Sequence, residues 1–251
     1  MSFSTATTIE DFQENLRAVR EKMDKAAERV GRDSSEVRLL PVSKTVPEER
    51  IRLAIAAGAH QLGENKVQEA KRKHANLIDE DVKWSIIGHL QTNKAKDVAA
   101  FASEFHALDS LRVAEALDRR LELVGRSLDV YVQVNTSGEE SKYGLEPEVV
   151  PDMLNAFKGF ESLNVKGLMT LAIFSDDKEA VRTCFQLLKR LRDEARDRDP
   201  DLIGPGELSM GMSGDYEIAI EEGANIVRVG QAIFGARSTT DAYYWPGGTT
   251  K

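Results

Sequence analysis

Lys44 is the first residue of the sequence whose type and position could do covalent chemistry. It follows a short apolar segment, and the alternation of a strand places its side chain on the same face as Leu40 and Val42. An amine at the end of such a face is partly withdrawn from water, which favours the neutral form that makes a Schiff base with a carbonyl group. A lysine that extends into solvent at the end of a strand has the same sequence context.

A second group of residues is small and lies just before a predicted helix. Ser209, Gly211, Ser213 and Gly214 precede a helix that we expect to begin near Asp215. Small side chains let backbone N–H groups approach an anion, and the N-terminus of a helix adds a favourable dipole. The segment therefore predicts a phosphate site, although a strand-to-helix turn capped by Ser213 or Asp215 explains the same pattern.

Arg228 is the third candidate, in the last apolar segment of the chain. It shares one face of that segment with Ile226 and Gly230, so it points inward if the intervening valines point outward. Gly230 would then offer its backbone to the same phosphate. A buried guanidinium needs an acceptor. That acceptor is either a ligand or an internal carboxylate such as that of Glu64 or Glu207.

A ligand that carries both an aldehyde and a phosphate would satisfy all three groups. Lys44 would hold the aldehyde carbon, and the 209–214 segment with Gly230 would hold the phosphate. Arg228 would face the ring of the ligand or its edge. Pyridoxal 5′-phosphate (PLP) is a cofactor that has these groups.

The elements that must position these residues alternate regularly along the chain. A leading amphipathic helix is expected over 8–30, with Thr8 as its cap. Eight apolar segments are expected to be strands, at 37–44, 60–64, 82–88, 104–108, 128–135, 165–172, 207–210 and 226–234. Helices are expected between them, at 48–57, 67–77, 93–101, 111–124, 147–157, 177–198 and 216–222.

Strict alternation of strands and helices indicates a parallel sheet in an α/β protein. Eight such units in about 200 residues fit a single closed (β/α)8 TIM-type barrel with an additional N-terminal helix, in which ligands bind at the C-terminal ends of the strands. An open doubly wound sheet is the alternative, but no glycine-rich dinucleotide turn follows the first strand. We expect one domain over 1–251, with the barrel at 37–235 and a loosely ordered tail at 238–251. Pro41 cannot donate a ladder hydrogen bond, which predicts a bulge or loose pairing in the first strand.

The composition narrows the classes of protein to be considered. Lys and Arg total 34 and Asp and Glu total 42, so the net charge is −8, which argues against a nucleic-acid-binding protein. The single cysteine, Cys184, excludes an intrachain disulfide framework and is typical of the reducing cytoplasm. No apolar run approaches the roughly 18 residues that cross a membrane, and the N-terminus lacks the features of a secretory signal. We therefore expect a cytoplasmic protein that binds neither membrane nor nucleic acid.

Six short motifs resemble those of the pyridoxal phosphate homeostasis protein family. They lie, in the family's order, at 41–45 (PVSKT), 63–65 (GEN), 87–94 (IGHLQTNK), 167–170 (GLMT), 208–213 (LSMGMS) and 227–230 (VRVG). The resemblance extends from the leading helix to about residue 235. It implies a barrel similar to the N-terminal domain of alanine racemase and a Schiff base on Lys44. It also implies a role in binding and buffering PLP, with no established catalysis.

The resemblance also implies further contacts with the cofactor. Besides Lys44 as the Schiff base, the residues expected to bind PLP are Asn65, His89, Met169, Ser209, Met212, Ser213, Arg228 and Gly230. Core packing is the alternative for Met169, and we expect Arg228 at the pyridine nitrogen, which it would keep unprotonated. Lys142 could offer a second amine, but a solvated surface lysine is the expectation there. No catalytic and no metal-binding residue is expected.

Two other functions remain open at this point. A PLP-dependent racemase of the same barrel class needs an acid or base on each face of the cofactor, and alanine racemase takes one of them from a tyrosine of its partner's second domain. We expect no such domain here, and Tyr143 is the tyrosine nearest to a strand end. A phosphate-binding barrel without a Schiff base, such as a sugar-phosphate isomerase, is the other. The expected partners are the cofactor and PLP-dependent apo-enzymes, and the expected state is a monomer, since a barrel has no exposed sheet edge.

Overall fold

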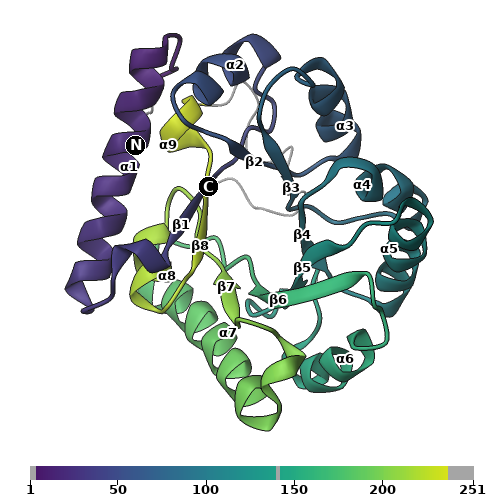
Figure 1. Ribbon diagram of the computed structural model, residues 1–251. Helices are drawn as coiled ribbons and strands as arrows, with labels where there is room; N and C mark the ends of the chain where they lie inside the picture. The colour runs from purple at the N-terminus through teal and green to yellow at the C-terminus, as the bar shows by residue number, and fades with distance from the viewer. Residues whose placement is uncertain (1–3, 140–141, 237–251) are drawn as a thin grey trace.

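Eight parallel strands form the central sheet of the computed structural model, which describes residues 4–139 and 142–236. They are β1 (Arg38–Pro41), β2 (Gln61–Glu64), β3 (Lys83–Ile86), β4 (Glu104–Leu108), β5 (Leu128–Gln133), β6 (Leu163–Met169), β7 (Glu207–Ser209) and β8 (Ile226–Val229). Their hydrogen-bonded order is β1-β8-β7-β6-β5-β4-β3-β2. Figure 1 shows them as a ring seen along its axis, which confirms the predicted (β/α)8 barrel.

Each strand is followed by a helix, and the helices surround the ring (Figure 1). They are α1 (Ile9–Arg29), α2 (Glu48–Ala56), α3 (Val67–Asn76), α4 (Ala95–Phe101), α5 (Leu111–Val124), α6 (Val150–Phe157), α7 (Lys178–Arg198), α8 (Tyr216–Glu221) and α9 (Gln231–Phe234). Short 3-10 turns lie at Ser34–Glu36, Thr92–Lys94, Pro147–Val149 and Pro200–Leu202. Within the described ranges, none of these helices combines the length and the apolar character that a membrane crossing requires.

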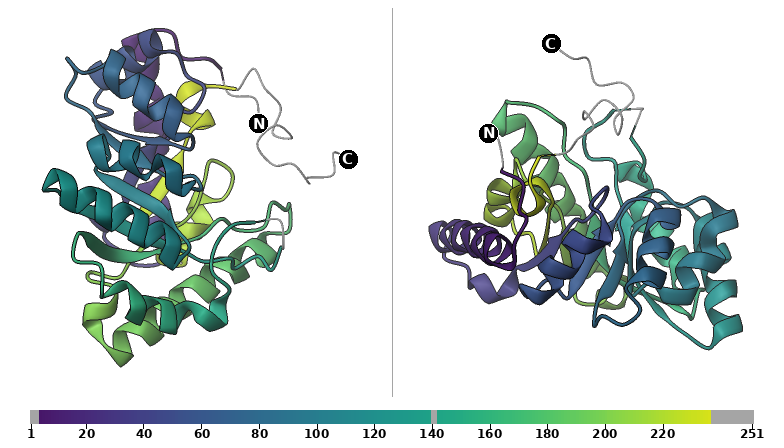
Figure 2. Two further views of the ribbon diagram at one scale, coloured as in Figure 1. Left: turned by 90° about the vertical axis from the view of Figure 1, so that its right-hand side faces the viewer. Right: turned by 90° about the horizontal axis from the view of Figure 1, so that it is seen from above.

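The leading helix α1, which was predicted over 8–30, packs on the outside of the ring. Thr8 and Asp11 form a reciprocal capping box at its start, which satisfies N–H groups that the helix itself leaves unpaired. Its buried face, which begins with Phe12, contacts α8 and α9. Figure 2 shows α1 from a second direction, again at the outer edge of the barrel.

The two faces of the strands differ in polarity. Side chains that point toward the helices are apolar and fully buried, and include Leu62, Trp84, Ile86, Phe105 and Val130. Side chains at the alternate positions point into the barrel, and many are polar: Gln61, Ser85, Glu104, His106, Tyr131, Ser209 and Arg228. Branched apolar residues usually fill this space. A polar interior has to be hydrogen-bonded throughout to be stable.

The ring is closed weakly between β1 and β2. Pro41 pairs with Val229 of β8 without any register shift, so the expected bulge is not found on that side. Toward β2, the described residues form one isolated bridge, between Val42 and Gly63, and the Ser43 N–H donates to the Gly63 carbonyl at 3.1 Å. The Val42 N–H donates to β8, so by alternation the N–H that Pro41 lacks would have pointed to β2. The predicted loose pairing of the first strand is therefore found at its β2 side.

The last strand is shorter than predicted. It ends at Val229, and residues 231–234, which were expected to continue it, form the helix α9. The neighbouring strand β1 also ends at this level, so a longer β8 would have no ladder partner on that side. The helix instead brings Phe234 into edge-on contact with Phe12 of α1, with ring centroids 5.5 Å apart. The predicted tail at 238–251 lies outside the described residues.

Candidate functional site

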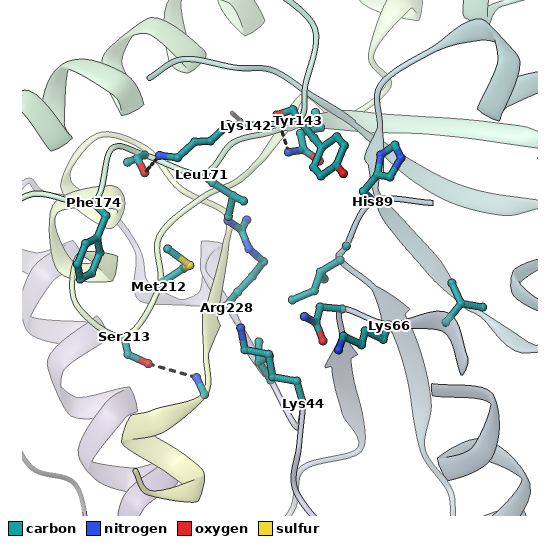
Figure 3. A pocket seen from close by; sticks show the side chains of 18 of the residues that line it. Lys44, Lys66, His89, Lys142, Tyr143, Leu171, Phe174, Met212, Ser213 and Arg228 are labelled. Carbon is teal, nitrogen blue, oxygen red and sulfur yellow. Dashed lines mark hydrogen bonds between the residues drawn. The ribbon is translucent and has the colours of Figure 1, made fainter. Parts of the chain in front are cut away.

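A pocket of about 540 Å³ opens at the C-terminal ends of the strands. Its walls come from the segments that follow every strand except β4, so it lies over the centre of the ring (Figure 3). The volume falls in the range of about 300–1,000 Å³ that is usual for small-molecule sites. The position is the one at which barrels of this class bind their ligands.

Lys44 is carried by a turn with an unusual backbone. The residue after it, Thr45, has a φ of +66°, which is uncommon for a residue branched at Cβ. The Thr45 N–H donates to Glu69 Oε1 of α3 at 2.7 Å, which ties the turn to that helix. The Lys44 side chain is half-buried and extends into the pocket (Figure 3).

A buried ion cluster supports this turn from behind. Lys73 is fully buried, and its ammonium donates to the Ser43 carbonyl oxygen and to Glu64 Oε1, both at 2.7 Å. A third hydrogen bond of the same length goes to Glu69 Oε1. Burial raises the pKa of Glu64, against the opposing charge of Lys73. Because a buried charge is tolerated only when its partners are in place, the cluster fixes the backbone on one side of Lys44.

One wall of the pocket presents backbone N–H groups. The Gly230 N–H donates to Ser213 Oγ at 3.2 Å, which joins the loop after β7 to the end of β8 (Figure 3). The N–H groups of Ser213, Gly214 and Gln231 have no protein acceptor within the described residues. A Cβ on Gly214 would meet nothing within 4 Å, whereas one on Gly230 would lie 3.2 Å from the Val42 carbonyl oxygen. Small residues thus leave room for an anion beside donors that the protein does not use.

Arg228 is 3% exposed and lines the pocket. Its guanidinium donates to Ser209 Oγ at 2.8 Å and to the Thr170 carbonyl oxygen at 2.7 Å. The alternative of a salt bridge to Glu64 or Glu207 is not found, because these carboxylates are bonded to Lys73 and to Tyr131. Burial lowers the pKa of Arg228 to about 10, so the group stays charged at neutral pH. A buried cation bonded to neutral acceptors retains donors and charge for a ligand.

The walls contributed by β2 and β3 are polar. Asn65 Oδ1 is buried at the pocket without a hydrogen-bond partner among the described residues, and a donor on a ligand would satisfy it. His89 Nδ1 lies 3.1 Å from Asp109 Oδ2. The His89 ring stacks on Tyr143 with centroids 3.9 Å apart, and Figure 3 shows the two rings face to face.

Lys142 is not the solvated surface lysine that the sequence suggested. Its side chain is 9% exposed, and its ammonium donates to the Ala172 carbonyl oxygen at 2.9 Å and pairs with Glu139. The loops after β5 and β6 lie side by side, which brings this acceptor over the lysine. Lys142 lines the pocket with Leu171 and Phe174, of which Phe174 is 89% exposed.

Seven of the nine residues expected at the cofactor line this one pocket: Lys44, Asn65, His89, Met212, Ser213, Arg228 and Gly230. Met169 and Ser209 are fully buried and do not line it. Both belong to strands rather than to the loops above them, so they lie beneath the pocket. Met169 packs in the core, and Ser209 contacts Arg228 instead.

Three polar residues close to the site, Glu104, His106 and Lys73, were not found from the sequence. Glu104 and His106 alternate along an otherwise apolar strand, and polar residues at every second position are the signal that could have revealed them. Lys73 gives no such signal, because its spacing of four from Glu69 is also that of ordinary exposed helix pairs. No group of His, Cys, Asp or Glu side chains suited to a metal ion occurs in residues 4–139 and 142–236.

Comparisons with known proteins agree with this geometry. A family model described as the N-terminal domain of alanine racemase matches residues 14–238. A pyridoxal phosphate homeostasis protein of Aquifex aeolicus is 42% identical over 224 residues, which cover 89% of this chain and 97% of that protein. A protein of the same name from Pseudomonas aeruginosa is 41% identical, with 89% and 95% covered.

Solved structures show the same fold. PipY of Synechococcus elongatus, solved with PLP bound, has a TM-score of 0.79 and 33% identity, and the match covers 89% of this chain and 100% of PipY. An alanine racemase of Clostridium difficile has a TM-score of 0.71 at 16% identity. That match covers 96% of this chain and 60% of the racemase, and at this identity it shows a shared fold alone.

Proposed function

Because the chain belongs to the family of pyridoxal phosphate homeostasis proteins, we propose that it binds PLP and takes part in the intracellular homeostasis of this cofactor. The observation that carries the proposal is a single pocket that combines the Lys44 amine with unused backbone N–H groups at Ser213 and Gly214. An amine and a set of anion donors are what an aldehyde and a phosphate require. The bound PLP in PipY supports the same assignment.

The residues present fit the functional groups of PLP. Lys44 supplies the amine for covalent attachment at the aldehyde carbon, and the N–H groups of Ser213, Gly214 and Gln231 serve the phosphate. Arg228, which is bonded to neutral acceptors, would serve the ring nitrogen of PLP and would keep it unprotonated. When PLP is bound through the nitrogen of an amine, its ring supplies an electron sink for the bonds next to that amine nitrogen. Asn65 Oδ1 gains a donor from the ligand, while His89 and Met212 complete the walls.

We further propose that the site holds and releases the cofactor instead of turning over a substrate. Tyr143 and Phe174, which line the pocket, are 58% and 89% exposed, so the pocket is open to solvent between them. Water and small amines can then reach the Lys44 side chain, which suits reversible exchange. An unprotonated ring nitrogen beside Arg228 is a poorer electron sink, which disfavours racemisation.

The wider setting is also a proposal. We propose that the protein is a single-domain monomer that acts in the cytoplasm and supplies PLP to apo-enzymes that depend on it. The continuous eight-stranded ring and the free Cys184, which is typical of a reducing compartment, support these assignments.

Absorbance with borohydride reduction and peptide mapping tests the binding proposal. Protein incubated with PLP should be yellow, and reduction should fix the cofactor to the peptide that contains Lys44. Lys44→Ala should lose the adduct, while Lys94→Ala, a matched change of another lysine in the same pocket, should keep it. An adduct that persists at full yield in Lys44→Ala would refute the role of Lys44.

The carrier role has its own test. Protein loaded with PLP is incubated with a panel of L-amino acids, and D-enantiomers are measured by chiral chromatography. We expect no more product than one equivalent of the protein. Sustained formation beyond that amount would show a racemase.

A further inference from the structure

A chain of hydrogen bonds runs from Arg228 in the pocket into the barrel, and its inner members, Ser209, His106 and Glu104, do not line the pocket. Arg228 Nη1 donates to Ser209 Oγ at 2.8 Å, and Ser209 Oγ lies 2.9 Å from His106 Nδ1. On the other side of the imidazole, His106 Nε2 lies 2.9 Å from Glu104 Oε2. The chain crosses the interior from β8 through β7 to β4, and β7 and β4 are not neighbours in the sheet.

The direction of each hydrogen bond follows from the groups themselves. A guanidinium can only donate, so Ser209 Oγ accepts from Arg228, and the single hydroxyl hydrogen is available for His106 Nδ1. With Nδ1 as an acceptor, a neutral imidazole carries its proton on Nε2 and donates it to Glu104.

The charges around the ring favour the neutral imidazole. His106 is fully buried, and burial is the largest effect that lowers its pKa, although the carboxylate of Glu104 opposes it. A charged ring would add a third cation between Arg228 and Arg38. Burial also opposes ionisation of Glu104, but its hydrogen bonds with His106 and Ser85 and the charge of Arg38, 2.8 Å away, outweigh it and lower the pKa of Glu104.

We propose that His106, as the neutral Nε2–H tautomer, is a positioning residue that links Arg228 to Glu104 and so holds the guanidinium in place for the cofactor ring. His106 does not line the pocket, and it acts through Ser209. The effect of His106 on the cofactor ring rests on the proposed function. The tautomer and the linkage are properties of the protein alone, so they can be tested without the cofactor.

The first experiment uses the protein without PLP. The chain has four histidines, and long-range ¹H–¹⁵N NMR of histidine-labelled protein distinguishes the two neutral tautomers and the charged ring. We expect one Nε2–H ring that does not titrate between about pH 5 and 8 and whose signals are absent from His106→Asn. An Nδ1–H ring or a charged ring at His106 would overturn the proposal.

The second experiment separates the two halves of the chain. Asparagine places an acceptor near the position of Nδ1, so His106→Asn keeps the contact with Ser209. Glutamine places a donor near the position of Nε2, so His106→Gln keeps the contact with Glu104 and leaves Ser209 without its acceptor. Because Ser209 loses one buried hydrogen bond next to Arg228, PLP affinity should fall about tenfold in His106→Gln. It should fall by a smaller factor in His106→Asn, which breaks the more distant contact with Glu104 and keeps the one with Ser209. The absorption band of bound PLP should shift in His106→Gln.

Tyr131→Phe is the matched control. Its ring packs on His106 with centroids 4.2 Å apart, and its hydroxyl donates to Glu207, outside the chain. We expect lower stability but an unchanged PLP spectrum. Equal PLP affinities and spectra in wild type and His106→Gln would overturn the positioning role. If the wild type binds no PLP while the tautomer is as expected, the proposed function fails and the linkage stands. If His106→Gln does not fold, the NMR experiment still decides.

Discussion

Lys73→Met should destabilise the fold by about 3–5 kcal/mol, the usual cost of removing one partner from a buried ion pair. Lys73 is fully buried and donates three hydrogen bonds, each 2.7 Å long. Methionine has a similar shape but no charge and no donor. The Glu64 carboxylate would keep the Ser43 hydroxyl but lose its buried cation, and the Ser43 carbonyl oxygen would keep only the Val46 N–H. Protonation of Glu64 would relieve part of this cost, which places the expected loss toward the lower end of the range.

Urea unfolding followed by circular dichroism measures the change in the free energy of unfolding. Lys71→Met is the matched control, because Lys71 lies on the same helix and pairs with Asp97 at 2.8 Å, but its side chain is 61% exposed. Exposed pairs contribute about 0–1 kcal/mol, so this variant should lie within about 1 kcal/mol of the wild type.

A double variant tests the origin of the loss. Lys73→Met combined with Glu64→Leu removes both buried charges, and it should recover at least half of the stability that Lys73→Met loses. The reasoning would be refuted if Lys73→Met stayed within about 1 kcal/mol of the wild type at an unchanged denaturant slope. It would also be refuted if the two single losses were additive in the double variant.

Two further predictions concern stability. Hydrogen bonds and the charge of Arg38 lower the pKa of Glu104 below its value of 4.5 in the unfolded chain, so its contribution to stability is present above pH 4.5 and is lost as the pH falls through the lowered pKa. Glu104→Gln should therefore flatten the acid side of a plot of urea midpoint against pH, and an unchanged acid side would contradict this assignment. Gly211→Ala should cost about 3 kcal/mol, because Gly211 has a φ of +93° and a Cβ there would lie 2.6 Å from the Cβ of Ala219. Thermal unfolding measures the loss of stability. Gly214→Ala is the control, because its Cβ would meet nothing within 4 Å, and equal losses in the two variants would contradict the steric explanation.

The fold was predictable because each of its units is local. An apolar segment followed by an amphipathic helix can be recognised without knowledge of the rest of the chain, and eight repeats leave few topologies. The error at 230–234 has a tertiary cause, since β8 ends where its partner β1 ends and Phe234 finds a contact on α1. The spacing of residues along the chain carries no information about where β1 ends or about the contact of Phe234 with α1.

The site was predictable where a side chain or a glycine stands at the end of a strand. Lys44, Arg228 and Gly230 line one pocket because strand ends meet at one face of a barrel. The partners of the buried charges were not predictable. Glu64 was one of two carboxylates considered as alternatives to a ligand for Arg228, but Lys73 reaches it from a helix. The depth at which each side chain ends inside a barrel is set by register and strand tilt.

The pairing of β1 has a consequence for the synthesis of the protein. The strand that leads to Lys44 is made early, yet its ladder is with β8, the last strand along the described residues, and within those residues its other edge carries one isolated bridge. Contacts between the two ends of a chain cannot form before the far end has left the ribosome. Nascent chains that lack β8 therefore cannot assemble the wall at Gly230 beside the strand of the lysine, and the pocket can be complete only after β8 has been made.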